Sequence, residues 1–162
     1  MHPFENIVHL DFDGVLTSEP FTRQCIFEHR RENWYGLDWF DPKCIELLRK
    51  IVNATGAKIV VSSSWRDLGM DKLRKVWFEN NMPGELIGTT PIWVLTKADA
   101  IKQWLKDNPC GHFAVLDDDN LDVPNLVKTN PSTGLTEEDA ETIIKILVGV
   151  EYIETLNPAC GK

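Results

Sequence analysis

The chain has 162 residues, of which 43% are hydrophobic and 26% charged, a composition typical of one globular domain and not of a disordered chain. Its formal net charge of −8 disfavours general nucleic-acid coating and binding to anionic membranes, because both depend on summed positive charge. No apolar run is long enough to span a membrane, no signal peptide is recognisable, and four widely spaced cysteines favour reduced thiols. We therefore expect a cytoplasmic protein that binds no membrane, and a monomer.

Short apolar runs alternate with amphipathic stretches along the chain. A first strand is predicted at 7–10, and residues 17–40 have no regular pattern and are predicted to be irregular. A helix follows at 42–55, then a strand at 58–61 and a helix at about 70–80. The remaining predicted elements are a strand at 86–87, a helix at 97–107, strands at 112–116 and 126–128, and a helix at 136–148. This alternation predicts an α/β domain over 1–162, with a mainly parallel sheet covered on both faces.

Polar side chains directly follow three of the predicted strands. Asp11 and Asp13 follow the first, 62–64 are three serines after the second, and 117–119 are three aspartates after the strand at 112–116. In open α/β sheets, ligands bind at the carboxyl ends of the strands, so these groups are expected to meet at one edge. Clustered carboxylates are costly without a cation, and their oxygen atoms suit Mg²⁺. The sequence therefore predicts a magnesium site at this edge.

The segment Asp11-Phe12-Asp13-Gly14-Val15 combines two carboxylates with a turn. In an extended segment, residues two apart point the same way, so Asp11 and Asp13 are expected to face one site. Gly14 allows the chain to turn sharply beside them. The alternative interpretation is an ordinary Asp-Gly turn after a strand.

This segment resembles motif I of the haloacid dehalogenase (HAD) superfamily. The order of motifs from residue 10 to about 136, above all Ser-Ser-Ser-Trp-Arg at 62–66, resembles the HAD domain associated with Swiss-army-knife RNA repair proteins. The resemblance implies a HAD-like (Rossmannoid) three-layer sandwich with a minimal cap. It also implies a Mg²⁺-dependent phosphomonoester hydrolase, and more weakly a role in RNA end repair.

The resemblance implies a role for each matching residue. Asp11 would attack phosphorus and form an aspartyl-phosphate, and Asp13 would protonate the leaving group and then activate water. Ser62, with Ser63 as the second choice, would bind the phosphoryl oxygens. Lys97, at the start of the helix before the strand at 112–116, would neutralise the nucleophile and the phosphoryl group. Lys97 could instead contact only the substrate.

The same resemblance implies the metal ligands. Asp11, the backbone carbonyl of Asp13 and the carboxylate of Asp118 would hold Mg²⁺. Asp117 would be a direct ligand, a water-mediated ligand or the group that orients Lys97.

Two residues after the serines have two open interpretations each. The guanidinium of Arg66 could bind the substrate phosphate with two parallel hydrogen bonds, or it could pair with Asp67 or another acid. Trp65 could stack on a substrate ring, or it could pack in the core.

Residues 17–40 form the only candidate insertion, and this segment is too short for a cap domain. An open site admits a macromolecular phosphate such as an RNA or DNA end. Basic and aromatic side chains of the insertion could hold such a strand, or could form a solvated loop: Arg23, His29, Arg30, Arg31, Trp34, Tyr35 and Trp39. Two alternatives to a hydrolase of macromolecular phosphates are a small-molecule phosphatase or nucleotidase, and a module that binds phosphorylated ends without turnover.

Overall fold

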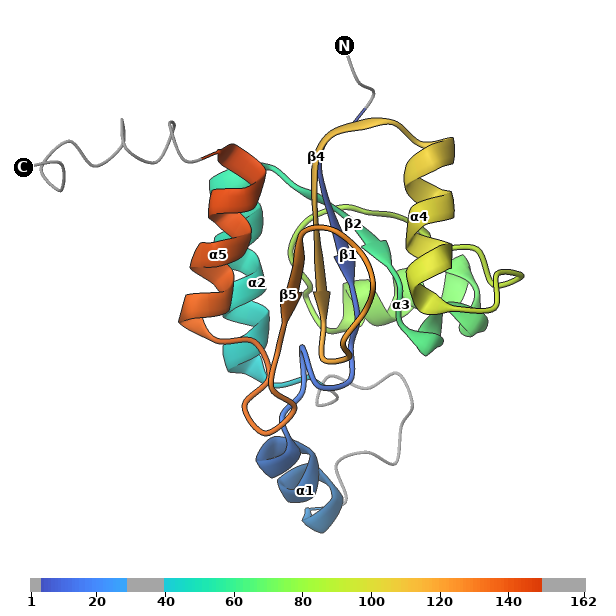
Figure 1. Ribbon diagram of the computed structural model, residues 1–162. Helices are drawn as coiled ribbons and strands as arrows, with labels where there is room; N and C mark the ends of the chain where they lie inside the picture. The colour runs from blue at the N-terminus through green and yellow to red at the C-terminus, as the bar shows by residue number, and fades with distance from the viewer. Residues whose placement is uncertain (1–3, 29–39, 150–162) are drawn as a thin grey trace, which may run out of the picture.

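The computed structural model describes residues 4–28 and 40–149, and its centre is a five-stranded sheet (Figure 1). The strands are β1 (Phe4–Leu10), β2 (Lys58–Val61), β3 (Leu86–Thr89), β4 (Cys110–Asp117) and β5 (Leu126–Lys128). They are all parallel, in the order β3-β2-β1-β4-β5. Because β1 lies at the centre, the carboxyl ends of β1, β2 and β4 meet at one edge.

The helices are α1 (Glu19–Phe27), α2 (Pro42–Thr55), α3 (Met70–Glu79), α4 (Lys97–Asp107) and α5 (Glu137–Val148), with a short 3₁₀ helix, η1 (Ser64–Leu68). Figure 1 shows α2 and α5 side by side on one face of the sheet and α4 on the other. Helix, sheet and helix form three layers, which confirms the predicted α/β architecture.

The central strand is apolar on both faces because both are covered. Val8 and Leu10 belong to the larger core cluster, shared with α2, α3 and α5. Ile7 points to the opposite face and packs with Trp104 of α4 in the smaller cluster. Strand residues alternate between the two faces, so neighbouring apolar residues of β1 supply both cores at once.

Asp41 begins α2 as its N-cap, accepting a hydrogen bond from Lys43 N at 3.0 Å, and Pro42 occupies the first turn. Gly56 ends this helix in the left-handed conformation, at φ 63°. Both ends of the helix predicted at 42–55 are therefore confirmed.

The prediction that residues 17–40 are irregular was wrong for 19–27, which form α1. Ser18 is the N-cap of this helix and its hydroxyl accepts from Phe21 N, with Pro20 in the first turn. Only Cys25 of α1 is buried, while Ile26 and Phe27 are exposed. A helix with so little buried surface has no apolar stripe for a periodicity argument to detect. The expectations for His29, Arg30, Arg31, Trp34, Tyr35 and Trp39 lie outside the described residues.

Across the ranges that the structure describes, no helix is both long enough and apolar enough to cross a membrane.

His9 is a polar residue inside the central strand. It is fully buried, neither ring nitrogen has a hydrogen-bond partner among the described residues, and its ring meets that of Trp104 edge-on at 5.1 Å. Burial lowers the pKa of His9 to about 3, so the ring is neutral in the folded protein at pH 7.

His9 is expected to make the protein sensitive to acid. The unfolded chain binds a proton at this ring below about pH 6.5, and the folded chain does so only near pH 3, so stability is lost as pH falls through this window. Between pH 7 and pH 5, the free energy of unfolding should fall by about 2 kcal/mol more in the wild type than in His9→Leu. Urea unfolding of both proteins at the two pH values measures the difference. Equal losses of stability in the wild type and in His9→Leu would contradict the conclusion that His9 is buried in its neutral form.

Candidate active site

Asp11 continues β1 by one residue, because its backbone N–H donates to Leu116 O of β4 at 3.0 Å. The residue is 5% exposed. Phe12 points into the core, where its ring lies edge-on to those of Phe40 and Trp65. Asp13 is exposed, and one of its oxygens accepts a hydrogen bond from the indole N–H of Trp65 at 3.1 Å. Packing of Phe12 therefore fixes both carboxylates, one buried and one open to solvent.

Gly14 forms the tight turn after the two aspartates. Its φ is +79°, and a Cβ at this position would lie 2.3 Å from Oδ2 of Asp118. Only glycine permits both the turn and the approach of the Asp118 carboxylate. Two hydroxyls hold the turn: Gly14 N donates to Thr17 Oγ1 at 3.0 Å, and Thr129 Oγ1 donates to Gly14 O at 2.7 Å.

Ser62 follows β2 at the same edge, where its backbone N–H donates to Leu10 O at 3.0 Å. Its side chain is fully buried, and its Oγ has no hydrogen-bond partner among the described residues. Buried hydroxyls in proteins are almost always hydrogen-bonded, so this one is suited to a ligand. Ser63 differs, because its Oγ accepts from Trp65 N at 3.2 Å and caps η1.

Arg66 lies in η1 and is half-buried. Its Nη1 donates to the backbone oxygen of Ser62 at 3.0 Å, and its Nε is buried without a partner in the described part of the chain. Among the described residues it forms no ion pair with Asp67. Trp65, packed against Phe12 and Phe40 and 8% exposed, is a core residue that also orients Asp13.

Lys97 begins α4, which starts at the N-cap Thr96. Its Nζ lies 2.9 Å from Oδ2 of Asp117, 3.5 Å from Oδ2 of Asp11 and 3.9 Å from Oδ2 of Asp119. The N-terminus of α4 thus brings one cation into contact with the acids that follow β1 and β4. Lys102, on the same helix, pairs instead with the exposed Asp122.

Asp11, Asp117 and Asp118 form the acidic cluster, in which one carboxylate oxygen of each residue lies within 4.8 Å of the other two. Asp117 is fully buried, and both of its oxygens are engaged: Oδ1 accepts from Asp119 N at 2.9 Å, and Oδ2 faces Lys97. Asp118 is partly exposed. Asp11 meets Lys97 at the longer distance of 3.5 Å, and Asp118 forms no ion pair among the described residues, so these two carboxylates are better placed than Asp117 to take a further cation.

The electrostatics of the cluster show an excess of negative charge. Burial, followed by the charge of Asp117, raises the pKa of Asp11 to about 7, although Lys97 opposes this rise. For Lys97, burial lowers the pKa, but Asp11 and Asp117 more than compensate and raise it above its ordinary value. The lysine therefore stays charged, and one lysine does not neutralise three neighbouring carboxylates.

The cluster fits a hard divalent cation. All of its donors are oxygens, the ligands that Mg²⁺ takes, and they already lie close together. The space for the Asp118 carboxylate exists only because Gly14 has no side chain. Asp11 and Asp118 would hold the ion, with Asp117 engaged by Lys97.

The structure brings together most of the residues selected from the sequence. Asp11, Asp117 and Asp118 lie together, Lys97 pairs with Asp11 and Asp117, and Ser62 lies at the same sheet edge. Ser63 points its hydroxyl at the backbone of η1 instead. The support around Asp13 and Gly14 was not predicted from the sequence, and it comes from Trp65, Thr17 and Thr129. The contacts of Trp65 and Thr129 join residues 52 and 115 positions apart, so no local pattern signals them.

A buried aspartate after the central strand, joined by acids after β4 and by a lysine from the preceding helix, is the arrangement of HAD-type hydrolases. The model of a family described as "HAD domain in Swiss Army Knife RNA repair proteins" matches residues 7–140, and the chain belongs to this family. The match confirms the resemblance inferred from the motifs. Comparison with curated proteins and with solved structures gives no match.

Proposed function

We propose that this protein is a Mg²⁺-dependent phosphomonoester hydrolase that works through an aspartyl-phosphate, with the ends of nucleic-acid strands or other macromolecular phosphates among its substrates. The observation that carries the proposal is the buried Asp11, which lies in contact with Lys97 beside a second carboxylate, Asp118. A buried carboxylate held against a cation can serve as a nucleophile, and the acid/base residue that hydrolysis requires follows two positions later as Asp13.

The chain's own residues can carry out both halves of the reaction. Asp11 attacks phosphorus through one carboxylate oxygen, and the bond from phosphorus to the leaving oxygen breaks as Asp13 gives that oxygen a proton. Water then attacks the aspartyl-phosphate, and Asp13 takes a proton from it, which releases inorganic phosphate and restores Asp11. The indole of Trp65 holds the carboxylate of Asp13 in place throughout.

Ser62, Lys97 and Arg66 would bind the phosphoryl oxygens. The Ser62 hydroxyl is buried without a partner, and Lys97 is charged and 22% exposed. Arg66 keeps donors free after its single bond to Ser62 O. Bound Mg²⁺ supplies positive charge that offsets the phosphoryl oxygens and keeps Asp11 ionised.

Two observations favour a substrate larger than a free metabolite. The acidic residue beside the site, Asp13, is exposed, and the described part of residues 17–40 is one short helix and not a cap domain. The family description refers to RNA repair proteins, which supports nucleic-acid ends as one class of substrate.

The proposal is tested by steady-state hydrolysis of p-nitrophenyl phosphate with Mg²⁺ and with EDTA, followed by substrates in two groups. One group contains RNA and DNA oligonucleotides with a 3′-phosphate, and the other contains free nucleotides and sugar phosphates. We expect turnover that requires Mg²⁺ and a higher kcat/KM on the oligonucleotides. Preference for the free compounds would support a small-molecule phosphatase, and binding without turnover of any substrate would support a module that only recognises phosphate.

A further inference from the structure

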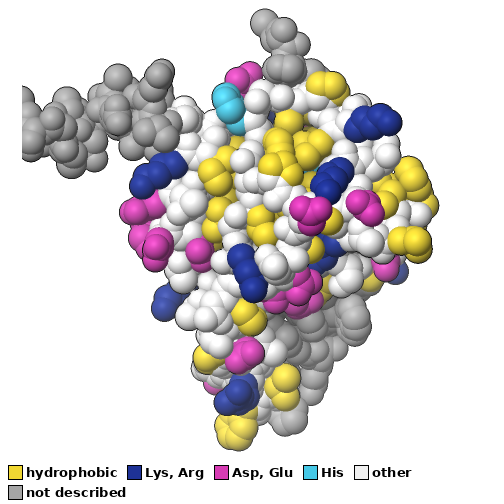
Figure 2. Space-filling view, viewed as in Figure 1, with side chains coloured by type: hydrophobic (Ala, Val, Ile, Leu, Met, Phe, Trp, Pro, Cys, Tyr) yellow, Lys and Arg dark blue, Asp and Glu magenta, His cyan; other side chains and the backbone are white. Residues whose placement is uncertain are grey.

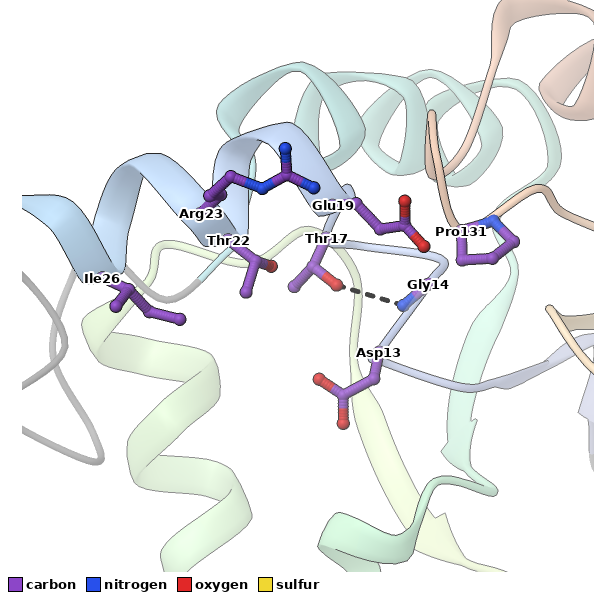
Figure 3. Close-up of a pocket in the computed structure, with 8 residues that line it drawn as sticks. All are labelled: Asp13, Gly14, Thr17, Glu19, Thr22, Arg23, Ile26 and Pro131. Atoms are coloured by element: carbon purple, nitrogen blue, oxygen red, sulfur yellow. Dashed lines mark hydrogen bonds between the residues drawn. The ribbon is translucent and has the colours of Figure 1, made fainter.

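A cavity of about 400 Å³ opens directly beside Asp13, between the turn after β1 and helix α1 (Figure 3). We call it the α1 pocket, and it is lined by Asp13, Gly14, Thr17, Glu19, Thr22, Arg23, Ile26 and Pro131. Gly14 belongs to this wall, and the Asp118 carboxylate occupies the space that a Cβ of Gly14 would fill. The pocket therefore begins where the acidic cluster ends.

The position of the α1 pocket beside Asp13 makes it the place where the leaving alcohol of the substrate would lie. In the proposed reaction, Asp13 protonates the oxygen of the leaving alcohol, so that oxygen must lie within hydrogen-bond reach of the carboxylate. The rest of the alcohol then extends away from phosphorus, on the Asp13 side of the site. The α1 pocket is the space that the structure provides there, and its volume is sufficient for a sugar ring.

We propose that the α1 pocket binds the leaving alcohol, that this alcohol is a sugar, and that Glu19 and Arg23 bind its remaining hydroxyls. The inference rests on the proposed phosphomonoesterase function and assigns a substrate class to it. The sugar could belong to a free sugar phosphate or to the terminal ribose of a nucleic-acid strand, since both present the same hydroxyl chemistry.

The charges of the pocket favour hydroxyl groups over a second phosphate. Two carboxylates, Asp13 and Glu19, and one guanidinium, Arg23, line it among the described residues. A second phosphate would meet net negative charge. A sugar hydroxyl can instead donate to the Glu19 carboxylate and accept from the Arg23 guanidinium. Ile26, 63% exposed, offers an apolar surface to the C–H face of a sugar ring.

Arg23 and Glu19 are the two charged groups of α1 that the proposal assigns to the sugar hydroxyls. Arg23 is exposed and forms no ion pair in the described part of the chain, and in Figure 3 its side chain extends along α1. Among the described residues, the Glu19 carboxylate accepts one long contact, 3.5 Å, from the hydroxyl of Ser132. Figure 2 shows basic, acidic and hydrophobic side chains exposed together at the end of the molecule where α1 lies in Figure 1.

The start of α1 is fixed relative to the reactive centre. Glu19 N donates to Pro131 O at 3.0 Å, and the hydroxyl of Ser18 donates to Asp41 Oδ2 at 3.3 Å. These contacts tie α1 to the loop after β5 and to the start of α2. The backbone of Glu19 is therefore held in place before substrate arrives, which lowers the entropic cost of binding.

The test compares Glu19→Gln and Arg23→Met with two matched controls, Glu141→Gln on the exposed face of α5 and Lys106→Met at the far end of α4. The substrates are p-nitrophenyl phosphate, whose leaving group has no other hydroxyl, ribose 5-phosphate, and an oligoribonucleotide with a 3′-phosphate. We expect both pocket variants to lower kcat/KM on the ribose substrates by about 10-fold and on p-nitrophenyl phosphate by less than about 2-fold, with the controls unchanged.

The two ribose substrates distinguish a free sugar phosphate from a strand end. The substrate on which the pocket variants lose more kcat/KM is the kind that the α1 pocket binds. Unchanged kinetics on both ribose substrates would overturn the inference and leave the phosphatase proposal intact. An equal loss on all three substrates would indicate only a structural role and would also overturn it. If the wild type hydrolyses no phosphomonoester while it is folded and loaded with Mg²⁺, both proposals fail.

Discussion

Asp11→Asn is expected to abolish hydrolysis of p-nitrophenyl phosphate, with kcat falling by at least about 10⁴-fold, the scale seen when a catalytic nucleophile is removed. The amide has no charged oxygen with which to attack phosphorus, and it removes one of the two carboxylates, Asp11 and the partly exposed Asp118, that would hold Mg²⁺. The measurements are initial rates and the incorporation of labelled phosphate into protein quenched in acid. Asp99→Asn, an exposed aspartate on α4, is the matched control and should retain both signals.

The same substitution should stabilise the fold, which separates lost chemistry from lost structure. The pKa of Asp11 is raised to about 7 in the folded chain, so folding favours the protonated carboxyl, and stability is lost as pH rises through 7. Asn mimics the neutral form at every pH. At pH 8 without divalent cations, we expect the free energy of unfolding to rise by about 1–3 kcal/mol, and to rise less at pH 5.

A destabilised Asp11→Asn protein would contradict this account of the cluster. Activity comparable to the wild type in a correctly folded Asp11→Asn protein would instead contradict the role of Asp11 as nucleophile. Chemical unfolding at both pH values, on the preparations used for the kinetics, distinguishes these two outcomes.

The reactive residues could be located from the sequence because of the regularity of parallel sheets. Asp11, Ser62 and Asp117 each lie at the end of a β-branched or apolar run, and such runs form buried parallel strands. Ser62 is the serine that directly follows the run, and it lies two residues after Val60, whose side chain packs with Trp104 of α4.

The features that the sequence does not predict are the orientation of Asp13, which depends on a contact between distant segments, and helix α1. Asp13 is oriented by Trp65, 52 residues away, and this contact forms only because η1 turns the indole back toward β1. Helix α1 carries Ile26 and Phe27 on its exposed side, so its hydrophobic pattern contradicts its position in the fold. Apolar periodicity identifies elements that bury a face, and α1 buries almost none.

Lys97→Met is expected to cause the largest loss of stability among single substitutions of the acidic cluster and its lysine. The ammonium group lies 2.9 Å from the fully buried Asp117 and 3.5 Å from Asp11. Its removal leaves two buried carboxylates without a cation, and breaking a buried pair in this way typically costs about 3–5 kcal/mol. We expect a loss of this size in the free energy of unfolding at pH 8 in EDTA.

The loss of stability in Lys97→Met should be smaller when the negative charge of the acidic cluster is reduced in another way. At pH 5.5 most Asp11 carboxyls are protonated, because the pKa of this group lies at about 7 even beside the lysine. Lower pH and added Mg²⁺ should therefore each recover part of the lost stability, and Asp11→Asn should recover part of it in the double variant. The comparison is urea unfolding at pH 8 and pH 5.5, with and without Mg²⁺.

Lys102→Met is the matched control, since Lys102 lies on the same helix and its pair with Asp122 joins two exposed side chains. Exposed pairs contribute little, so this variant should differ from the wild type by less than about 0.5 kcal/mol under every condition. If Lys97→Met behaves like Lys102→Met, the acidic cluster does not depend on its lysine. If it is destabilised equally at both pH values and is insensitive to Mg²⁺, the lysine acts through packing and not through its charge.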